Sequence, residues 1–320
     1  MSMIQNWLIA LGAGAASALL VATVATGSPL ALPLFYLAPL PVLIVGLGWT
    51  HVSALIAASA AAVAIGVFFG VELLLAYVAG VGLPAYVLSY LALMAREPQP
   101  GAPLEWFPIG RVVLAAAILG CLAVAALIPL VAGSVEGYQA ALRTLFQAMF
   151  EESPGAGGAD VERMVDLLVL VMPPAAAVVT MVTQIGNLWL AAHIARVSGR
   201  LMRPWPDLAT ISVPRPVAVL LVGTFIATNL AGGFVGLMAQ LLTSTLVMAF
   251  AFIGLATIHW ITRGAAGRAL VIATVWIAAL ALGWPFALLA LLGLAETLFG
   301  VRQRFRRGGP PGCPPAANDV

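Results

Sequence analysis

The stretch FVGLMAQLLTSTLVMAFAFIGLATIHWITRG, residues 234–264, shows what class of protein this is. From Phe234 to Ile261 it contains no lysine, arginine or acidic residue. A helix rises 1.5 Å per residue, so about 20 apolar residues cross the roughly 30 Å hydrocarbon core of a bilayer. We therefore predict a transmembrane helix over residues 234–261, which ends where His259 and Arg263 reach the membrane surface.

The composition extends this interpretation to the whole chain. Of the 320 residues, 62% are hydrophobic and 8% are charged, whereas about 25% of the residues of a soluble domain are charged. The apolar runs are continuous and rich in alanine, leucine and valine, unlike the alternating strands of a membrane β-barrel. The pattern predicts an all-α polytopic membrane protein.

Ten transmembrane helices fit the sequence, and we predict that they form a single domain over residues 1–305. They cover residues 7–26, 30–49, 52–70, 72–94, 111–132, 165–194, 217–231, 234–261, 269–283 and 285–301. Gly283 to Pro285 interrupts a long apolar run, so the last two could also be one broken helix. We favour two helices joined by a tight hairpin.

The placement of arginine predicts the orientation of these helices. Every basic residue is arginine, and the 14 arginines fall mainly in the segments 96–111, 196–215, 263–268 and 302–307. Cytoplasmic loops accumulate positive charge, so these segments and both chain termini are predicted to be cytoplasmic. The expected location is the bacterial inner (cytoplasmic) membrane, with the lipid bilayer as the first partner.

The segment 134–164 carries mostly acidic charge and is predicted to lie outside the cell membrane. Within it, YQAALRTLFQAMF, residues 138–150, places its apolar residues at helical spacing on one face. This pattern predicts an amphipathic helix that lies on the outer leaflet or caps the bundle. At the other end of the chain, residues 306–320 have too little apolar content to fold, and we predict a disordered cytoplasmic tail.

Polar side chains inside the helices form the first candidate site. Thr183, Gln184 and Asn187 lie on one face of the helix 165–194, and Asn229 and Gln240 lie on the next two helices. Such groups normally face protein or a water-filled cavity, because an unpaired amide in hydrocarbon costs several kcal/mol. We predict that these five residues line a ligand pocket. The alternative is that they only join helices, at about 0.6 kcal/mol per hydrogen bond.

The second candidate site is a polar cluster at the inner surface, formed by His259, Arg263 and Glu296. An acidic residue within a membrane helix often marks a functional site, but Glu296 could also form an ion pair with an arginine of the neighbouring loop. The three histidines and two cysteines lack the spacing of metal ligands. We therefore expect no metal and no cofactor.

Motifs of soluble enzymes are missing from the sequence. We find no phosphate-binding loop, no dinucleotide-binding glycine fingerprint, no zinc-protease motif and no nucleophile elbow. No hydrophilic stretch is long enough for a separate catalytic domain. We therefore expect that the protein is not an enzyme and does not bind nucleic acid.

Three stretches resemble the YybS-like family of bacterial integral membrane proteins, a family of unknown function. They are PLFYLAPLPVLIVGLGW (33–49), FIGLATIHW (252–260) and LLGLAETLFGVRQR (291–304), and the resemblance covers about residues 1–305. No catalytic or binding residue carries over, because that family has no established activity.

A more distant similarity is to the substrate-binding (S) components of energy-coupling-factor vitamin transporters. Those proteins have a proline-bearing early helix and rows of small residues that dock a coupling subunit. Rows of the same kind occupy residues 10–22 and 54–70 here, although internal packing explains them equally well. S components usually have about six helices, whereas ten are predicted for this chain.

The function that these observations favour is the binding or transport of a small molecule, in the manner of such a transporter component. The expected partners are a small-molecule ligand and a membrane or ATPase subunit. The alternative is a membrane scaffold or envelope-assembly protein that does not transport. A scaffold would recruit its partners through the arginines of residues 196–215 and 302–307.

Overall fold

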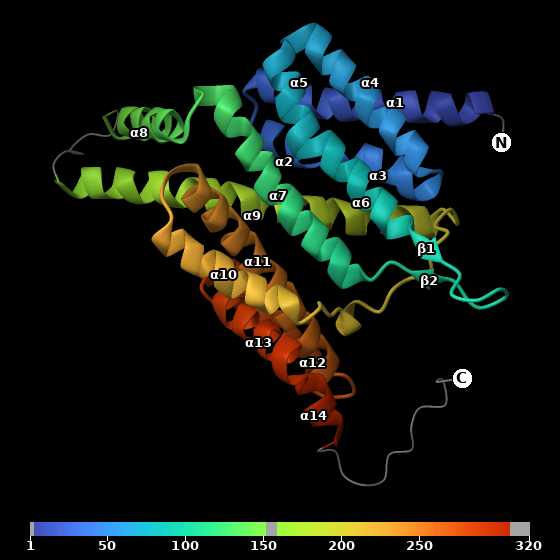
Figure 1. Ribbon diagram of the computed structural model, residues 1–320. Coiled ribbons are helices and arrows are strands. Elements are labelled where there is room, and N and C mark those ends of the chain that lie inside the picture. The colour runs from blue at the N-terminus through green and yellow to red at the C-terminus, as the bar shows by residue number, and fades with distance from the viewer. Residues whose placement is uncertain (1–2, 152–158, 308–320) are drawn as a thin grey trace. The chain divides into compact units, whose positions relative to one another are not determined.

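The computed structural model describes residues 3–151 and 159–307, and this part of the chain is almost entirely helical (Figure 1). The first helices are α1 (Met3–Ala22), α2 (Ala31–Tyr36), α3 (Pro39–Gly48), α4 (His51–Phe69), α5 (Val71–Tyr77), α6 (Leu83–Leu93) and α7 (Ile109–Ala132). They are followed by α8 (Val135–Glu151), α9 (Ala159–Val197), α10 (Pro216–Leu230), α11 (Gly233–Ile261), α12 (Arg268–Leu282), α13 (Pro285–Phe299) and α14 (Val301–Arg307).

The irregular elements are short. A 3-10 turn, η1 (Thr23–Thr26), follows α1, a π-helical turn, η2 (Val78–Gly82), joins α5 to α6, and a second 3-10 turn is η3 (Leu208–Thr210). Two-residue strands β1 (Ala95–Arg96) and β2 (Glu105–Trp106) pair antiparallel and close the loop between α6 and α7. The sequence pattern did not predict this small hairpin.

The predicted all-α polytopic class is confirmed. Seven helical segments of the described chain are long and apolar enough to cross a membrane. Three further apolar helices, α10, α12 and α13, have 15 residues each, or about 22 Å at 1.5 Å per residue. They coincide with three of the ten predicted spans but are shorter than the bilayer core, so the count of ten stays a prediction.

The last two predicted helices are separate. Helix α12 ends at Leu282 and α13 begins at Pro285. Gly283 between them has a φ of +72°, a conformation that glycine adopts without strain. The predicted tail lies outside the described residues, except that Arg306 and Arg307 belong to α14.

The chain forms two compact units. Unit 1 contains Met1–Pro206 and Leu221–Leu246, and unit 2 contains Asp207–Leu220 and Val247–Val320. Helices α10 and α11 each contribute residues to both units. The predicted single domain over residues 1–305 is therefore subdivided into these two units.

Within unit 1, both rows of small residues lie at contacts between helices. Helix α1 lies on α4, and Gly14 approaches so closely that a Cβ atom there would lie 2.5 Å from the carbonyl oxygen of Ala57. Ala10 of the α1 row is buried, and the buried Ala54 and Ala58 of the α4 row lie beside Gly46 of α3 and Gly82 of η2. The structure thus uses these rows for internal packing, which lets the two backbones come close.

Helix α8 is the amphipathic helix predicted within residues 134–164. Its buried Phe146 packs with Val165 and Val169 of α9, and Arg143 forms an ion pair with Asp166 at 2.6 Å. The apolar face of α8 is therefore covered in part by α9. Its position on the outer side of the membrane stays a prediction.

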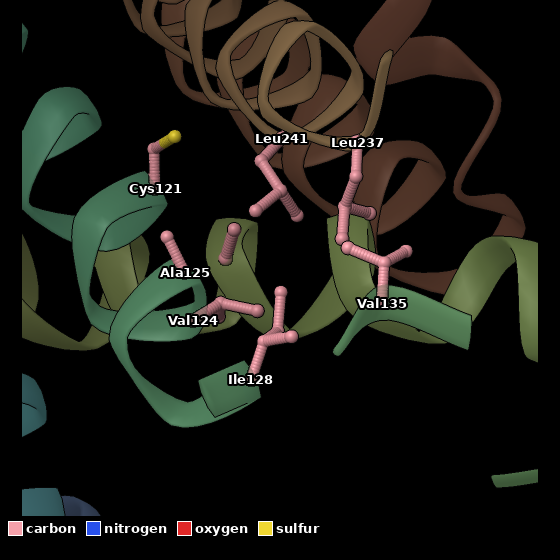
Figure 2. Packing of buried hydrophobic residues seen from close by; sticks show 8 residues of the cluster. Cys121, Val124, Ala125, Ile128, Val135, Leu237 and Leu241 are labelled. Atoms are coloured by element: carbon pink, nitrogen blue, oxygen red, sulfur yellow. The ribbon is translucent and has the colours of Figure 1, made fainter. Parts of the chain in front are cut away.

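A hydrophobic core of unit 1 joins α7, α8, α9 and the first part of α11 (Figure 2). Its buried residues are Cys121, Val124, Ala125, Ile128, Val135, Ala177, Leu237 and Leu241. Figure 2 shows Val135 and Leu237 pointing toward each other at the edge of this core. This edge forms the apolar wall of the cavity described below.

Unit 2 is held together by a close approach of α11 and α13. Gly254 lies against the carbonyl oxygen of Leu289, and Gly293 lies against the carbonyl oxygen of Phe250. A Cβ atom at either glycine would overlap the facing backbone. Both positions therefore need glycine, because no other residue lets two helix backbones pack at this separation.

Candidate functional site

The candidate site is a cavity of about 240 Å³ in unit 1, at one end of α8, α10 and α11. Two glycine turns create it. Gly133, with a φ of +69°, reverses the chain from α7 into α8, and Gly233, with a φ of +58°, does the same between α10 and α11. The cavity is lined by Val135, Glu136, Gln139, Leu170, Thr228, Ala231, Gly233, Gly236, Leu237 and Gln240.

The polar lining of this cavity is concentrated in four side chains, Glu136, Gln139, Thr228 and Gln240. Glu136 is the one charged residue among the lining residues that the structure describes, and it lies in the first turn of α8. The partial positive charge of a helix N-terminus favours a carboxylate there. Glu136 borders the cavity, so a ligand bound there can contact its carboxyl group.

Gln240 is held in the cavity wall by a hydrogen bond to α9. Its Nε2 donates to the carbonyl oxygen of Leu170 at 3.1 Å. That carbonyl would normally accept from residue 174, but Pro174 has no N–H group. Gln240 thus replaces a helical hydrogen bond that proline has removed, and its amide oxygen remains available to the cavity.

Gln184 makes the same kind of bond at a different place. Its Nε2 donates to the carbonyl oxygen of Gly80 at 2.8 Å, and Gly80 lies in the π-helical turn η2. Pro84 follows four residues later and cannot donate to Gly80. Gln184 is 1% exposed, so this bond is made in the interior of the unit.

Asn187, one turn further along α9, joins the break between α2 and α3. Its Nδ2 donates to the carbonyl oxygen of Tyr36 and to that of Thr183, both at 2.8 Å. The helical donor to Tyr36 would be Leu40, whose N–H donates to Leu37 instead. Thr183 therefore takes part through its backbone, and Asn187 satisfies a carbonyl at a helix end.

The five predicted pocket residues divide between separate places. Gln240 lines the cavity, whereas Gln184 lies about 21 Å further along α9, counted from Leu170 at 1.5 Å per residue. Asn229 is exposed, donates to Phe225 of its own helix at 2.8 Å and is not among the cavity residues. The structure does not gather Thr183, Gln184, Asn187, Asn229 and Gln240 around one pocket.

Sequence reasoning missed Glu136 and Gln139 as lining residues. The sequence pattern uses the acidic charge of this segment only to predict the outer side of the membrane. The available signal was the position of the amphipathic helix directly after Gly133, but which face of that helix meets α10 and α11 depends on tertiary packing.

The residues of the predicted inner-face cluster all belong to unit 2, and Arg302 lies within electrostatic reach of both Glu296 and Arg263. Arg263 pairs with Asp207 at 2.5 Å, and Glu296 pairs with Arg302, whose Nε lies 3.6 Å from Oε1. In the described part of the chain, no ion pair joins His259 or Arg263 to Glu296. Glu296 thus pairs with Arg302 and not with His259 or Arg263, and a functional role for this polar cluster stays a prediction.

Arg302, which the sequence pattern marks as cytoplasmic and as part of a possible partner-binding segment, makes several hydrogen bonds in this region. It is 8% exposed. Its guanidinium donates to Thr257 Oγ1 at 3.0 and 3.2 Å and to the carbonyl oxygen of Ile211 at 2.9 Å. Burial lowers the pKa of Arg302, while the neighbouring Glu296 carboxylate acts in the opposite direction.

The arginines of residues 196–215 make contacts with tryptophan. Arg196 lies over Trp205 at 4.9 Å and Arg200 lies over Trp49 at 4.3 Å. Arg203 donates to the carbonyl oxygen of Ala92 at 3.0 Å. Much of this positive charge is therefore engaged within unit 1, through cation–π contacts and a hydrogen bond.

Carboxylate and histidine metal sites are not a feature of the described chain. Across residues 3–151 and 159–307, no three His, Cys, Asp or Glu side chains lie close enough together to hold a metal ion.

The chain was compared with known protein families, curated proteins and solved structures. A family model described as "Predicted membrane protein (DUF2232)" matches residues 15–297. No curated protein and no solved structure matches the chain.

Proposed function

Because this chain belongs to the DUF2232 family of predicted membrane proteins, we propose that it is a membrane protein that binds a small polar molecule in the cavity beside Glu136. The family match confirms the expectation of a membrane family of unknown function. The predicted arginine topology supports a place in the bacterial inner membrane. The proposed role is binding, without catalysis.

The observation that carries this proposal is the lining of the cavity. One carboxylate, two amides and one hydroxyl border a cavity of about 240 Å³, whose remaining lining is apolar or glycine. Ligand pockets typically measure 300–1,000 Å³ and combine a few placed polar groups with an apolar wall. This cavity lies just below that range, which favours a small ligand.

Charge narrows the chemical class of the ligand. Glu136 supplies one negative charge, and the side-chain oxygens of Gln139, Gln240 and Thr228 can accept hydrogen bonds. A ligand with an ammonium or another strong donor group would satisfy these acceptors. We propose a small amine, such as an amino acid or a polyamine fragment, as the ligand class.

The same site supports transport in the manner of an S component, with a membrane or ATPase subunit as partner. The structure limits where such a partner would bind. Residues of the small-residue rows of α1 and α4 already contact other helices of unit 1, so a coupling subunit would use another surface. The scaffold alternative is less favoured, because Arg196, Arg200 and Arg203 already contact residues of unit 1.

Ligand binding to the purified protein in lipid nanodiscs tests the proposal. A panel of amino acids, polyamines and neutral polyols is screened for a rise in the melting temperature, and hits are confirmed by calorimetry. We expect amines to bind and Glu136→Gln to weaken them at least tenfold. Truncating one partner of a close charge pair at a binding site commonly costs 2–5 kcal/mol.

Glu162→Gln is the matched control. Glu162 also lies in the first turn of a helix, α9, and is exposed, but it does not line the cavity. It should leave binding unchanged. If no amine binds the wild type, or if both variants weaken binding equally, the proposed site is wrong.

A further inference from the structure

Two buried amide oxygens on α9 have no hydrogen-bond donor among the residues that the structure describes. They are Oε1 of Gln184 and Oδ1 of Asn187. The two side chains are 1% and 5% exposed. A buried polar atom without a partner is destabilising, so two on one helix need a physical explanation.

The orientation of both amides is set by their nitrogen atoms. Nε2 of Gln184 donates to Gly80, and Nδ2 of Asn187 donates to Tyr36 and Thr183. Turning either amide over would place two oxygens against each other and lose these bonds. The unpartnered oxygens are therefore a consequence of the fold, and they are not removed by exchanging O and N.

Both oxygens lie on the same face of α9, because residues three apart in a helix are neighbours. That face packs against two interrupted helices, α2–α3 and α5–η2–α6. Each interruption exposes a backbone carbonyl, at Tyr36 and at Gly80, and each carbonyl oxygen can accept a second bond. Four uncharged oxygens are thus brought to one region of the interior of unit 1.

We propose that Gln184 Oε1 and Asn187 Oδ1, with the carbonyl oxygens at Tyr36 and Gly80, bind a sodium ion. Carbonyl oxygens can replace the hydration shell of an alkali cation inside a membrane protein. Interrupted membrane helices commonly supply such oxygens to Na⁺. A divalent ion fits less well, because Ca²⁺ and Mg²⁺ are bound mainly through carboxylates, which these four groups lack.

The site is independent of the cavity beside Glu136. Gln184 lies about 21 Å along α9 from Leu170, which borders that cavity. The proposed sodium site therefore does not depend on the proposed amine ligand, and the two proposals are tested by different measurements.

The first test measures the melting temperature of the full chain in nanodiscs at constant ionic strength. Sodium chloride replaces choline chloride stepwise, with potassium chloride as a third series. A bound ion stabilises only the folded state, so the melting temperature should rise with the logarithm of the sodium concentration, by about 3 °C or more at 150 mM. Choline is too large for the site and should give no rise.

The second test counts the ion directly, by equilibrium dialysis with radioactive sodium. We expect one sodium ion per chain for the wild type. Asn187→Leu should lose it, whereas Asn229→Leu should keep it. The control is matched, because Asn187 and Asn229 each donate to the carbonyl four residues earlier, but only Asn187 is buried.

Equal melting temperatures in sodium and choline would overturn the proposal and assign the two oxygens to a buried water. Equal sodium binding by the two asparagine variants would also overturn it. If Asn187→Leu does not fold, the wild-type titration still decides, because a site that binds sodium must show the dependence without any substitution.

Discussion

Replacing Glu296 by alanine is expected to lower the free energy of unfolding by about 3 kcal/mol, because Arg302 would stay buried without its counter-charge. The side chains of Arg302 and Glu296 are 9% and 13% exposed. Glu296 also accepts the backbone N–H of Arg302 at 2.8 Å. The substitution removes both interactions at once.

The magnitude follows from these contacts. Breaking a buried ion pair by removing one partner costs about 3–5 kcal/mol. The lower end applies here, because Thr257 and the carbonyl of Ile211 still accept from the Arg302 guanidinium. The same reasoning predicts that replacing both residues, Glu296→Leu with Arg302→Met, costs less than Glu296→Ala alone, since no charge is then left buried.

The assay is unfolding in mixed micelles by titration with a denaturing detergent, followed by circular dichroism. Glu105→Ala is the matched control, because Glu105 pairs with Arg96 at 2.8 Å while both side chains are exposed. Glu105→Ala should lower the free energy of unfolding by less than about 0.5 kcal/mol. The reasoning would be refuted by a Glu296→Ala variant as stable as the control, or by a double variant less stable than the single one.

Three further predictions concern other contacts. Gly254→Ala should lower the free energy of unfolding by about 2 kcal/mol, because the added methyl group forces α11 away from α13. The control is Gly223→Ala, whose added carbon meets nothing within 4 Å. It should not lower the free energy of unfolding in the same detergent titration. Gln184→Met should lower the free energy of unfolding less in a Pro84→Ala background than in the wild type. In that background the N–H of residue 84 could donate to the carbonyl oxygen of Gly80, which now accepts from Gln184. Equal losses in both backgrounds would contradict this. The hydrogen bond from Arg263 lowers the pKa of Asp207. The ion pair therefore contributes fully to the free energy of unfolding above about pH 5, and this contribution is lost as the pH falls through the lowered pKa. Solvent screening keeps that contribution below about 1 kcal/mol, and a pH series of melting temperatures should show that Asp207→Asn is less acid-sensitive than the wild type.

The polar stripe of α9 shows how far sequence reasoning reached. The spacing of Thr183, Gln184 and Asn187 correctly placed them on one face of a membrane helix. It could not show that the two amides bind the ends of interrupted helices, because their partners lie 104 and 151 residues away in the chain. The pairing of Glu296 failed for a related reason, since Gly300 ends α13 in a left-handed conformation and turns Arg302 back toward it.

Hydropathy and arginine placement were enough to establish a helical membrane protein, because the cost of burying charge in lipid depends on composition and not on packing. The position of Pro174 also identifies the carbonyl of Leu170 as lacking its α-helical donor, since this follows from covalent structure alone. Which amide approaches each carbonyl, and which helix ends enclose the cavity beside Glu136, was decided by tertiary packing. Those contacts depend on how distant segments fit together in three dimensions, and local sequence carries little information about that fit.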